Sequence, residues 1–475
     1  MATADLELCY LSASEALERF KARTLSPVEL LDAQIARTQA VNPKLNAITY
    51  DYFDRAREQA KKAEAKYGKT DGRLRALEGV PVAIKDFHAV KGEITTLGSK
   101  IFENSRPDYT APTVDRLLRA GAIMHLRTTT PEFAHSGATH SPLWGVTRNP
   151  WNLEYTPGGS SGGAGAVVAA GMGTLADGTD GGGSIRIPAA ACGLFGYKPP
   201  FGRNPLDRDH PFETILHYGP IVRSVADAAL MQNVMSGPHP EDHSSLPGRV
   251  RLPATYEGIR GWKVALSMDL GYLQIDPEVE EKTRRAAALF RELGCEVEEV
   301  ELGWDYGALD ICVTWWEGIF AGLVGEYLPR WQYEMDPFVV RLVERGLRLS
   351  AARLYQCYAM RGRMWQQLQP ILKSHDILIC PTNTVPAVKA DHDNADPDYR
   401  INGVRVSAYG GWIATYGFNQ VSQCPVMSVP TGFSACGVPI GMQIVGRPYD
   451  DHSVFRAAAA FEGATQPWQD KRPAI

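Results

Sequence analysis

Residues 157–188 read PGGSSGGAGAVVAAGMGTLADGTDGGGSIRIP, and they set two serine positions in glycine-rich turns. Glycines allow tight turns and close backbone approach. The first turn carries Ser160 and Ser161 and leads into a Gly- and Ala-rich run, which predicts a closely packed helix over Ser161 to Ala170. In the second turn Gly181, Gly182 and Gly183 precede Ser184. Successive free N–H groups in such a turn can converge on an anion, as an oxyanion hole requires, so Ser184 is predicted as a nucleophile.

Other interpretations of these turns remain open on this stretch alone. Gly158 to Gly162 matches the G-x-S-x-G nucleophile elbow, which needs a later Asp or Glu and a His. His210, His217 and His452 are candidates for that His, but nothing near them in the sequence supports the role. A phosphate-binding loop would need the pattern G-x-x-x-x-G-K-[ST], which is missing. A glycine turn with a serine N-cap and no function explains the first turn equally well.

A third segment, Gly79-Val-Pro-Val-Ala-Ile-Lys85-Asp86, places a lysine at the end of an apolar run. The run Val80–Ile84 predicts a buried strand. Desolvation at its end favours the neutral amine of Lys85, which can act as a base. A lysine that extends from the strand end into solvent is the structural alternative, and this segment alone favours it. Val82 to Lys85 also matches the lysine strand of protein kinases, but the Gly-rich and H-R-D loops of kinases are missing.

Taken together and in this order, the three segments resemble the amidase-signature family over nearly the whole chain. Ser160 and Ser184 stand 24 positions apart, which is the spacing that this family uses. Further stretches resemble its other landmarks, namely Thr130 to Ala134 (T-P-E-F-A), Asn149 to Asn152, Asp376 to Thr382 and Gly437 to Gln443.

The resemblance implies a role for each matched residue. Lys85 would be the base, Ser160 the proton bridge, held through a cis peptide in relatives, and Ser184 the nucleophile that forms an acyl-enzyme. The oxyanion hole would comprise Gly181, Gly182 and Gly183, and supporting roles would fall to Ser161, Asp180 and Arg186. The reaction would be cleavage of an amide or carbamate C–N bond, with esterase or urethanase activity also expected. Neither a metal nor a cofactor is expected, and no H-E-x-x-H pattern or clustered ligand set occurs.

Two departures from the family pattern concern the substrate. Many relatives have Asn where this chain has Thr129, and many have Thr or Ile at Gly181. The form D-G-G-G-S-I-R-I-P-A resembles the branch that contains hydrolases of nylon oligomers and of synthetic carbamates. The aromatic-rich residues 303–370 are more often simply core in such a chain, but Trp315 and Trp316 are candidates, with Thr129, for substrate contact.

The fold class predicted for residues 1–475 is α/β, as a single large domain with a mixed, twisted β-sheet covered by helices on both faces. Its parts would be N-terminal helices over about 1–75, a catalytic core over about 76–235 and a helical substrate-pocket insertion over about 303–370. Strand–helix–strand alternation over Trp262–Val300 supports this class. Further elements are predicted at Ser12–Arg23, Ser26 to Asn42-Pro43, Val114–Ala120, Ala122–Leu126, Val225–Met235, Asp376–Cys380, Pro425–Pro430, Pro439–Val445 and Ser453–Glu462.

Composition limits the kinds of partner and the cellular location that we expect. The chain has 475 residues, a formal net charge of −5 and no basic stripe, so nucleic acid is not an expected partner. Its eight cysteines form no C-x-x-C pair, which favours reduced thiols in the cytoplasm. Met1 to Tyr10 lacks a signal-peptide pattern, and no apolar run of about 18 residues was found, so no membrane is expected. We expect a small amide, carbamate or ester substrate and a monomer or homodimer. One component of an amidotransferase that acts on charged tRNA, and a non-catalytic scaffold, remain as alternatives.

Overall fold

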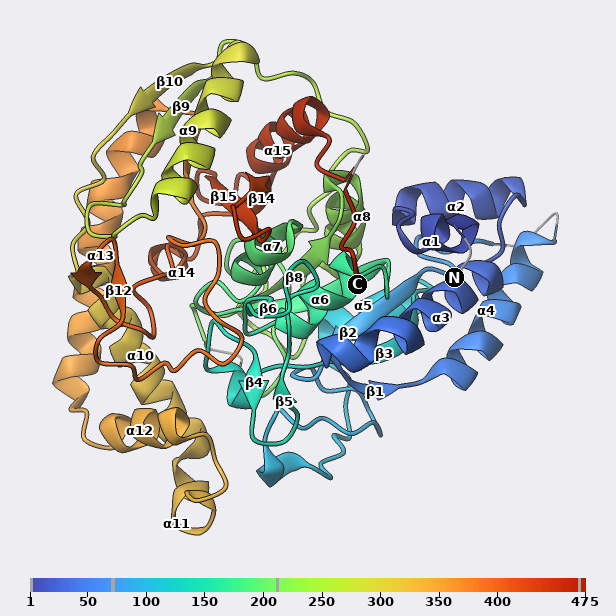
Figure 1. Ribbon diagram of the computed structural model, residues 1–475, viewed down its shortest axis with the longest axis horizontal. Coiled ribbons are helices and arrows are strands. Elements are labelled where there is room, and N and C mark those ends of the chain that lie inside the picture. The colour runs from blue at the N-terminus through green and yellow to red at the C-terminus, as the bar shows by residue number, and fades with distance from the viewer. Residues whose placement is uncertain (1–2, 70–72, 211–212, 469–470) are drawn as a thin grey trace.

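The computed structural model describes residues 3–69, 73–210, 213–468 and 471–475 (Figure 1). Among these residues, 11 strands form one mixed sheet in the order β1-β3-β2-β6-β8-β7-β14-β15-β11-β9-β10. Parallel pairing joins β3, β2 and β6 and, at the other end, β11, β9 and β10, while the central strands are antiparallel. The predicted single α/β domain with a mixed sheet is confirmed.

The strands of this sheet have the following bounds: β1 Ile48–Asp51, β2 Pro81–Lys85, β3 Ile123–Thr128, β6 Leu175–Asp180, β7 Phe195–Lys198, β8 His217–Val222, β9 Lys263–Leu266, β10 Glu296–Glu299, β11 Ile377–Pro381, β14 Val426–Phe433 and β15 Pro439–Val445. Two small hairpins lie outside it, formed by β4 His140–Ser141 with β5 Gly145–Val146 and by β12 Arg400–Ile401 with β13 Val404–Arg405.

The helices have the following bounds: α1 Thr3–Cys9, α2 Ala13–Ala22, α3 Pro27–Leu45, α4 Phe53–Tyr67, α5 Pro112–Arg119, α6 Gly162–Ala169, α7 Arg186–Cys192, α8 Val225–Met235, α9 Pro277–Glu292, α10 Gly307–Val324, α11 Leu328–Trp331, α12 Pro337–Gly346, α13 Ala351–Ser374, α14 Gly417–Gln420 and α15 Asp451–Thr465. Short 3₁₀ turns occur at Lys100–Phe102, Glu132–Ala134 and Gly325–Tyr327.

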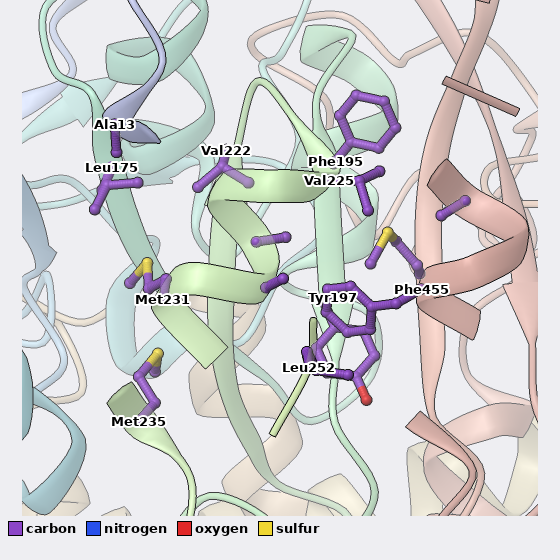
Figure 2. Close-up of a cluster of buried hydrophobic side chains, with 14 of the residues drawn as sticks. Ala13, Leu175, Phe195, Tyr197, Val222, Val225, Met231, Met235, Leu252 and Phe455 are labelled. Carbon is purple, nitrogen blue, oxygen red and sulfur yellow. The ribbon is translucent and has the colours of Figure 1, made fainter. Parts of the chain in front are cut away.

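Alternation of side chains along the strands builds a core on each face of the sheet. In β2, Val82 and Ile84 join the core beneath α2, α5, α8, α9 and α15, whereas Ala83 joins the core beneath α6 and α7. Figure 2 shows the first of these cores, where Met231 and Met235 of α8 lie near strand residues. Helices α10 and α13 cover the far end of the second face. The sheet is therefore covered on both sides, as predicted.

The N-terminal helix α3 begins where the sequence predicted but ends later. Ser26 caps it through a capping box with Glu29, and Pro27 occupies its first turn. The predicted end at Asn42-Pro43 is wrong, because the helix continues to Leu45. Pro43 lies in the last turn, where its missing N–H removes a single hydrogen bond. Asn46 then ends the helix in a left-handed conformation, and its N–H donates to the Asn42 carbonyl at 2.8 Å.

Helices α10 to α13 form the helical region that was expected over about 303–370. In the described part of the chain, Gly307–Trp331 is the one segment long and apolar enough to cross a membrane by length and composition. In the structure, α10 within this segment packs against α12 and α13. A core helix of a folded protein meets the same criteria of length and composition.

Candidate active site

The side chains of Lys85, Ser160 and Thr179 meet in a buried cluster. Lys85 Nζ lies 2.7 Å from Ser160 Oγ and 2.7 Å from Thr179 Oγ1. The peptide bond between Gly159 and Ser160 is cis. The lysine and the first serine that the sequence singled out are thus in hydrogen-bond contact, and Thr179 is a contact that the sequence analysis missed.

Sheet topology explains why these residues meet. Lys85 ends β2 and Thr179 lies near the end of β6, and the two strands are parallel neighbours. The carboxyl ends of parallel strands open at the same edge of a sheet, which is where sites of α/β proteins form. Ser160 precedes α6, which packs over β2 and β6 on that side.

Lys85 is fully buried, and this changes its ionisation. Burial lowers the pKa of Lys85 to about 7, against the opposing influence of Asp177 and Asp180. A large share of the amine is therefore unprotonated at neutral pH. A neutral amine has a lone pair that can accept a proton from the Ser160 hydroxyl 2.7 Å away.

Ser184 lies at the cavity into which this cluster opens. Ser160, Thr179, Gly181 and Ser184 line one cavity of about 190 Å³. The loop bearing Ser184 is tied to the first serine turn, because the Ser161 N–H donates to the Ser184 carbonyl at 3.2 Å. The side chain of Ser161 also anchors β6, since its Oγ accepts from the Thr179 N–H at 3.2 Å.

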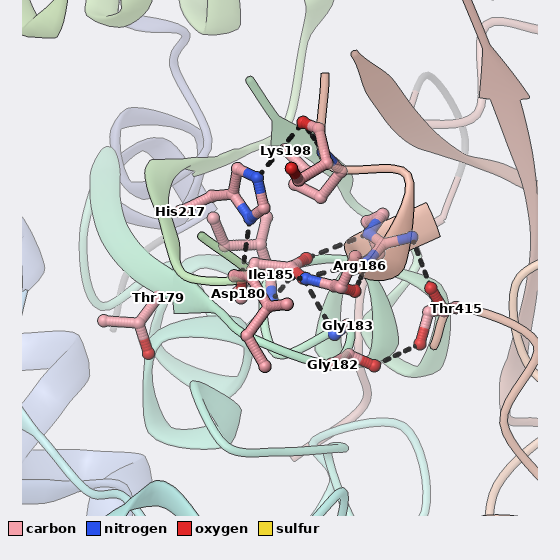
Figure 3. Close-up of polar contacts among 12 residues, drawn as sticks. Thr179, Asp180, Gly182, Gly183, Ile185, Arg186, Lys198, His217 and Thr415 are labelled. Atoms are coloured by element: carbon pink, nitrogen blue, oxygen red, sulfur yellow. Dashed lines mark hydrogen bonds and ion pairs between the residues drawn. The ribbon is translucent and has the colours of Figure 1, made fainter. Parts of the chain in front are cut away.

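A buried ion pair holds the glycine loop in shape (Figure 3). Arg186 Nη2 and Nε lie 2.8 and 2.9 Å from the two carboxylate oxygens of Asp180. Asn419 also donates to Asp180 Oδ1, at 2.9 Å, and Thr415 Oγ1 donates to the Gly182 carbonyl at 2.6 Å. Although burial alone would raise the pKa of Asp180, the Arg186 guanidinium holds it well below its usual range. The predicted supporting residues thus lie against the loop that carries Ser184.

The amides of the loop differ in their availability. The Gly183 N–H donates to Asp180 Oδ1 at 2.8 Å, so this amide already has an acceptor. Among the described residues, no atom accepts a hydrogen bond from the amides of Gly181 or Gly182. The geometry therefore leaves Gly181 and Gly182 free to donate to an oxyanion, and it gives Gly183 a different part, which is to fix the loop to Asp180. The sequence had grouped all three glycines together.

The weaker substrate candidates are placed differently from one another. Trp316 lines the cavity. Trp315 is not among its lining residues but donates from Nε1 to Glu213 Oε1 at 3.1 Å, and Glu213 is one of them. Thr129 lies outside the cavity lining, where its hydroxyl pairs with Thr147 at 2.8 Å.

The sequence analysis missed most of the cavity wall. Apart from Trp316, its apolar residues are Phe87, Leu97, Phe102, Phe133, Ala134, Leu216, Ile319, Phe320, Leu323 and Val324. Asp209, His210 and Glu213 complete it. Two positions carried a usable signal, because Phe87 follows Lys85 by two residues and Phe133 lies inside the T-P-E-F-A landmark. Ala134 lies in the same landmark, and Ile319 to Val324 fall within the region expected to form a substrate pocket. The remaining residues come from segments without a motif.

Arg186→Met is expected to lower the free energy of unfolding by about 3–5 kcal/mol, since it leaves the Asp180 carboxylate buried without its partner. Urea unfolding followed by circular dichroism measures this loss. Lys389→Met is the control, because Lys389 pairs with Glu154 on the exposed surface and should change stability much less. Similar losses in the two variants would contradict a structural role for the buried pair.

Comparisons with known proteins agree with this architecture. The family model described as Amidase matches residues 29–455. An acylamidase of Rhodococcus erythropolis is 37% identical over 486 residues, which cover 99% of this chain and 98% of the relative. One of the subunits of the glutamyl-tRNA(Gln) amidotransferase of Geotalea daltonii is 32% identical, with 99% of this chain and 100% of the relative covered.

Two solved structures are similar over almost the whole chain. A bacterial aryl acylamidase of the amidase signature family superposes with a TM-score of 0.90 at 31% identity, covering 96% of this chain and 97% of that one. A 6-aminohexanoate cyclic dimer hydrolase superposes with a TM-score of 0.87 at 30% identity, covering 98% of this chain and 99% of that one.

Proposed function

This chain belongs to the amidase family and hydrolyses carbon–nitrogen bonds of non-peptide amides, and from that premise we propose that it does so through an acyl-enzyme on Ser184. In this proposal Lys85 is the base and Ser160 the proton bridge. The observation that carries it is the 2.7 Å contact between the buried Lys85 amine and the Ser160 hydroxyl, beside a cavity that Ser184 shares.

The reaction follows from the chemistry of these groups. A serine hydroxyl is a weak nucleophile at neutral pH and needs a base. Neutral Lys85 takes the proton of Ser160 while Ser160 takes that of Ser184, whose oxygen attacks the substrate carbonyl. The amides of Gly181 and Gly182 donate to the oxyanion. The proton returns through Ser160 to the leaving nitrogen, and water then repeats the relay to release the acid.

The cavity favours an apolar substrate of modest size. Its volume of about 190 Å³ and its wall of Phe, Leu and Trp side chains suit an aryl or short alkyl group next to the amide. Five of its wall residues come from α10, which supports a pocket-forming role for the helical region over about 303–370. They are Trp316, Ile319, Phe320, Leu323 and Val324. Anilides, short oligoamides such as nylon oligomers, carbamates and esters all present a carbonyl that fits this description.

The pH dependence of the wild-type enzyme tests the base. Only the neutral form of Lys85 can accept a proton, so kcat/KM is expected to rise with pH through an apparent pKa near the Lys85 value of about 7. Steady-state rates on one anilide across the acid, neutral and alkaline range measure it. An acid limb close to the ordinary lysine pKa of about 10.4 would mean that burial does not lower the pKa of Lys85 enough to make it a base at neutral pH.

A substrate panel separates the proposed function from its rivals. The purified single chain is expected to hydrolyse at least one of a set of anilides, aliphatic amides, carbamates and esters. A component of an amidotransferase would instead need its partner subunits for activity, as the relative from Geotalea daltonii is named for such an assembly. Inactivity of the lone chain on the whole panel, with activity restored only by partner subunits, would favour that alternative.

A further inference from the structure

A second buried acid lies directly behind Lys85, and the proposed reaction does not use it. Asp177 stands on β6, and its Oδ1 accepts a hydrogen bond from the backbone N–H of Lys85 at 2.7 Å. Its other oxygen, Oδ2, lies 3.3 Å from Nε2 of His88. The backbone N–H of His88 in turn donates to the Lys85 carbonyl at 3.1 Å. Asp177 and His88 are both fully buried, so they flank the lysine from inside the protein.

The facing atoms of this pair lack other partners. Within the described residues, neither Asp177 Oδ2 nor either ring nitrogen of His88 makes a hydrogen bond of good geometry. The edge of the Tyr218 ring system closes off the imidazole, with ring centroids 4.4 Å apart. A carboxylate facing the unprotonated nitrogen of a neutral imidazole would set lone pair against lone pair. A single proton between the two atoms removes that conflict.

The other charged groups around this pair are already balanced. Asp86 on β2 pairs with Arg127 of β3, and Asp180 pairs with Arg186 of α7. Asp207 accepts from Tyr218 of β8 and pairs with His210. Among the described titratable groups around this pair, Lys85, Asp177 and His88 therefore remain without a partner that settles their charge.

Burial acts on all three leftover groups in the direction that removes charge. It raises the pKa of Asp177 to about 7 and lowers that of His88 to about 3, and it lowers the pKa of Lys85 to about 7. Lys85 ammonium with Asp177 carboxylate, and Lys85 amine with a protonated Asp177, carry the same total charge. A proton can therefore leave the amine for the acid without adding net charge to the site.

We infer that His88 is neutral with its own proton on Nδ1 and that Asp177 carries a second proton facing His88 Nε2, so that Lys85 stands as a free amine inside a buried site without net charge. Neither residue touches the cavity, so both are positioning residues that act through Lys85. The inference rests on the proposed role of Lys85 as base. If Asp177 were ionised instead, its charge would stabilise the Lys85 ammonium and reduce the fraction of active base.

The test is the rate at which a fluorophosphonate labels Ser184, measured against pH in the full-length protein. Asp177→Asn keeps an oxygen to accept the Lys85 N–H but never carries charge. Because Asp177 is already protonated in the inferred state, the acid limb of labelling is expected to stay in place. Loss of an ionised Asp177 would instead move it to lower pH, by about one unit. Asp227→Asn is the matched control, because Asp227 is another buried acid, bonded to Ala13 and Ser14 far from Lys85 in the fold, and it should leave the limb in place.

His88→Leu tests the Asp177 proton independently. It removes the nitrogen that accepts the proton of Asp177, so Asp177 should ionise more readily and the limb should move to higher pH. That shift should vanish in an Asp177→Asn background. The inference is overturned if Asp177→Asn moves the limb to lower pH by about one unit or if His88→Leu shifts it equally in both backgrounds. Should Asp177→Asn fail to fold, an unmoved limb in His88→Leu alone overturns it. Wild-type protein that is not labelled at Ser184, or is labelled without any pH dependence, would instead count against the proposed function.

Discussion

Ser184→Ala is expected to abolish hydrolysis of both an anilide and the phenyl ester with the same acyl group, with kcat/KM falling by at least about 10⁴-fold on each. The substitution removes the attacking oxygen itself, so no property of the leaving group can compensate. Ser184 is partly exposed at the cavity, and the loop is held by Asp180 and Arg186, so the variant should keep its fold. Steady-state rates on the matched pair of substrates measure the effect.

Labelling gives the companion measurement for this prediction. A sulfonyl fluoride or fluorophosphonate should add to Ser184 in the wild type, and mass spectrometry of the digested adduct identifies the site. Ser184→Ala should take up no label. An adduct on Ser160 or Ser161 would overturn the assignment of the nucleophile and would favour the elbow interpretation of the first turn.

Lys85→Ala and Lys85→Arg are both expected to lower kcat/KM on the anilide by about 10²–10⁴-fold, the usual contribution of a general base. Arginine is as damaging as alanine because its guanidinium stays protonated in proteins. The loss should be smaller on the matched phenyl ester. An amine leaves poorly unless its nitrogen is protonated, whereas a phenoxide needs less help. Ser160→Ala should follow the same pattern, because Ser160 lies between the base and the nucleophile.

Two outcomes would count against this role. An arginine variant with substantial activity would rule out Lys85 as the base. Equal losses on amide and ester for Lys85→Ala would mean that the lysine assists only the attack, and proton return through Ser160 would then be dropped from the mechanism.

The parts of the fold that could be predicted are those where burial alone dictates the pattern. Helix α8 was predicted at its observed bounds, Val225–Met235, and the predicted pairing of the strands over 425–430 and 439–445 appears as β14 with β15. These segments are largely apolar runs that are buried over most of their length. The ends of elements were less well predicted, as the continuation of α3 past Pro43 shows.

Strand β6 was not predicted, although it is central to the site. Its sequence LADGTD contains Asp177, Thr179 and Asp180, which are unfavourable in a buried strand by propensity. Apart from Asp177 Oδ2, these polar groups bind Lys85, Ser161 and Arg186, which approach from elsewhere in the fold. Residues that form a strand because of their partners cannot be identified from that strand alone.

The site, like the fold, was predictable where a local sequence pattern decides it and not where partners from elsewhere in the fold decide it. The motifs located the positions of Lys85, Ser160 and Ser184. In the structure Ser160 and Ser184 line one cavity and Lys85 contacts Ser160 from behind it. Their order and spacing sufficed for this, whereas the roles came from the resemblance to a family. The distinct parts of Gly181 and Gly183 depend on which amide the Asp180 carboxylate reaches, and that is a matter of three-dimensional geometry.

The indole of Trp316 fills the space that a side chain at position 181 would need. A Cβ at Gly181 would lie 2.6 Å from Cη2 of Trp316, closer than real contacts allow. Residue 181 and residue 316 therefore compete for a single volume, and only one of them can be large. A redesign of this part of the pocket must therefore change both residues together. For instance, a larger side chain at position 181 requires a smaller one in place of Trp316. The bulk that closes this part of the pocket can therefore come either from helix α10, as it does here, or from a side chain on the loop at position 181.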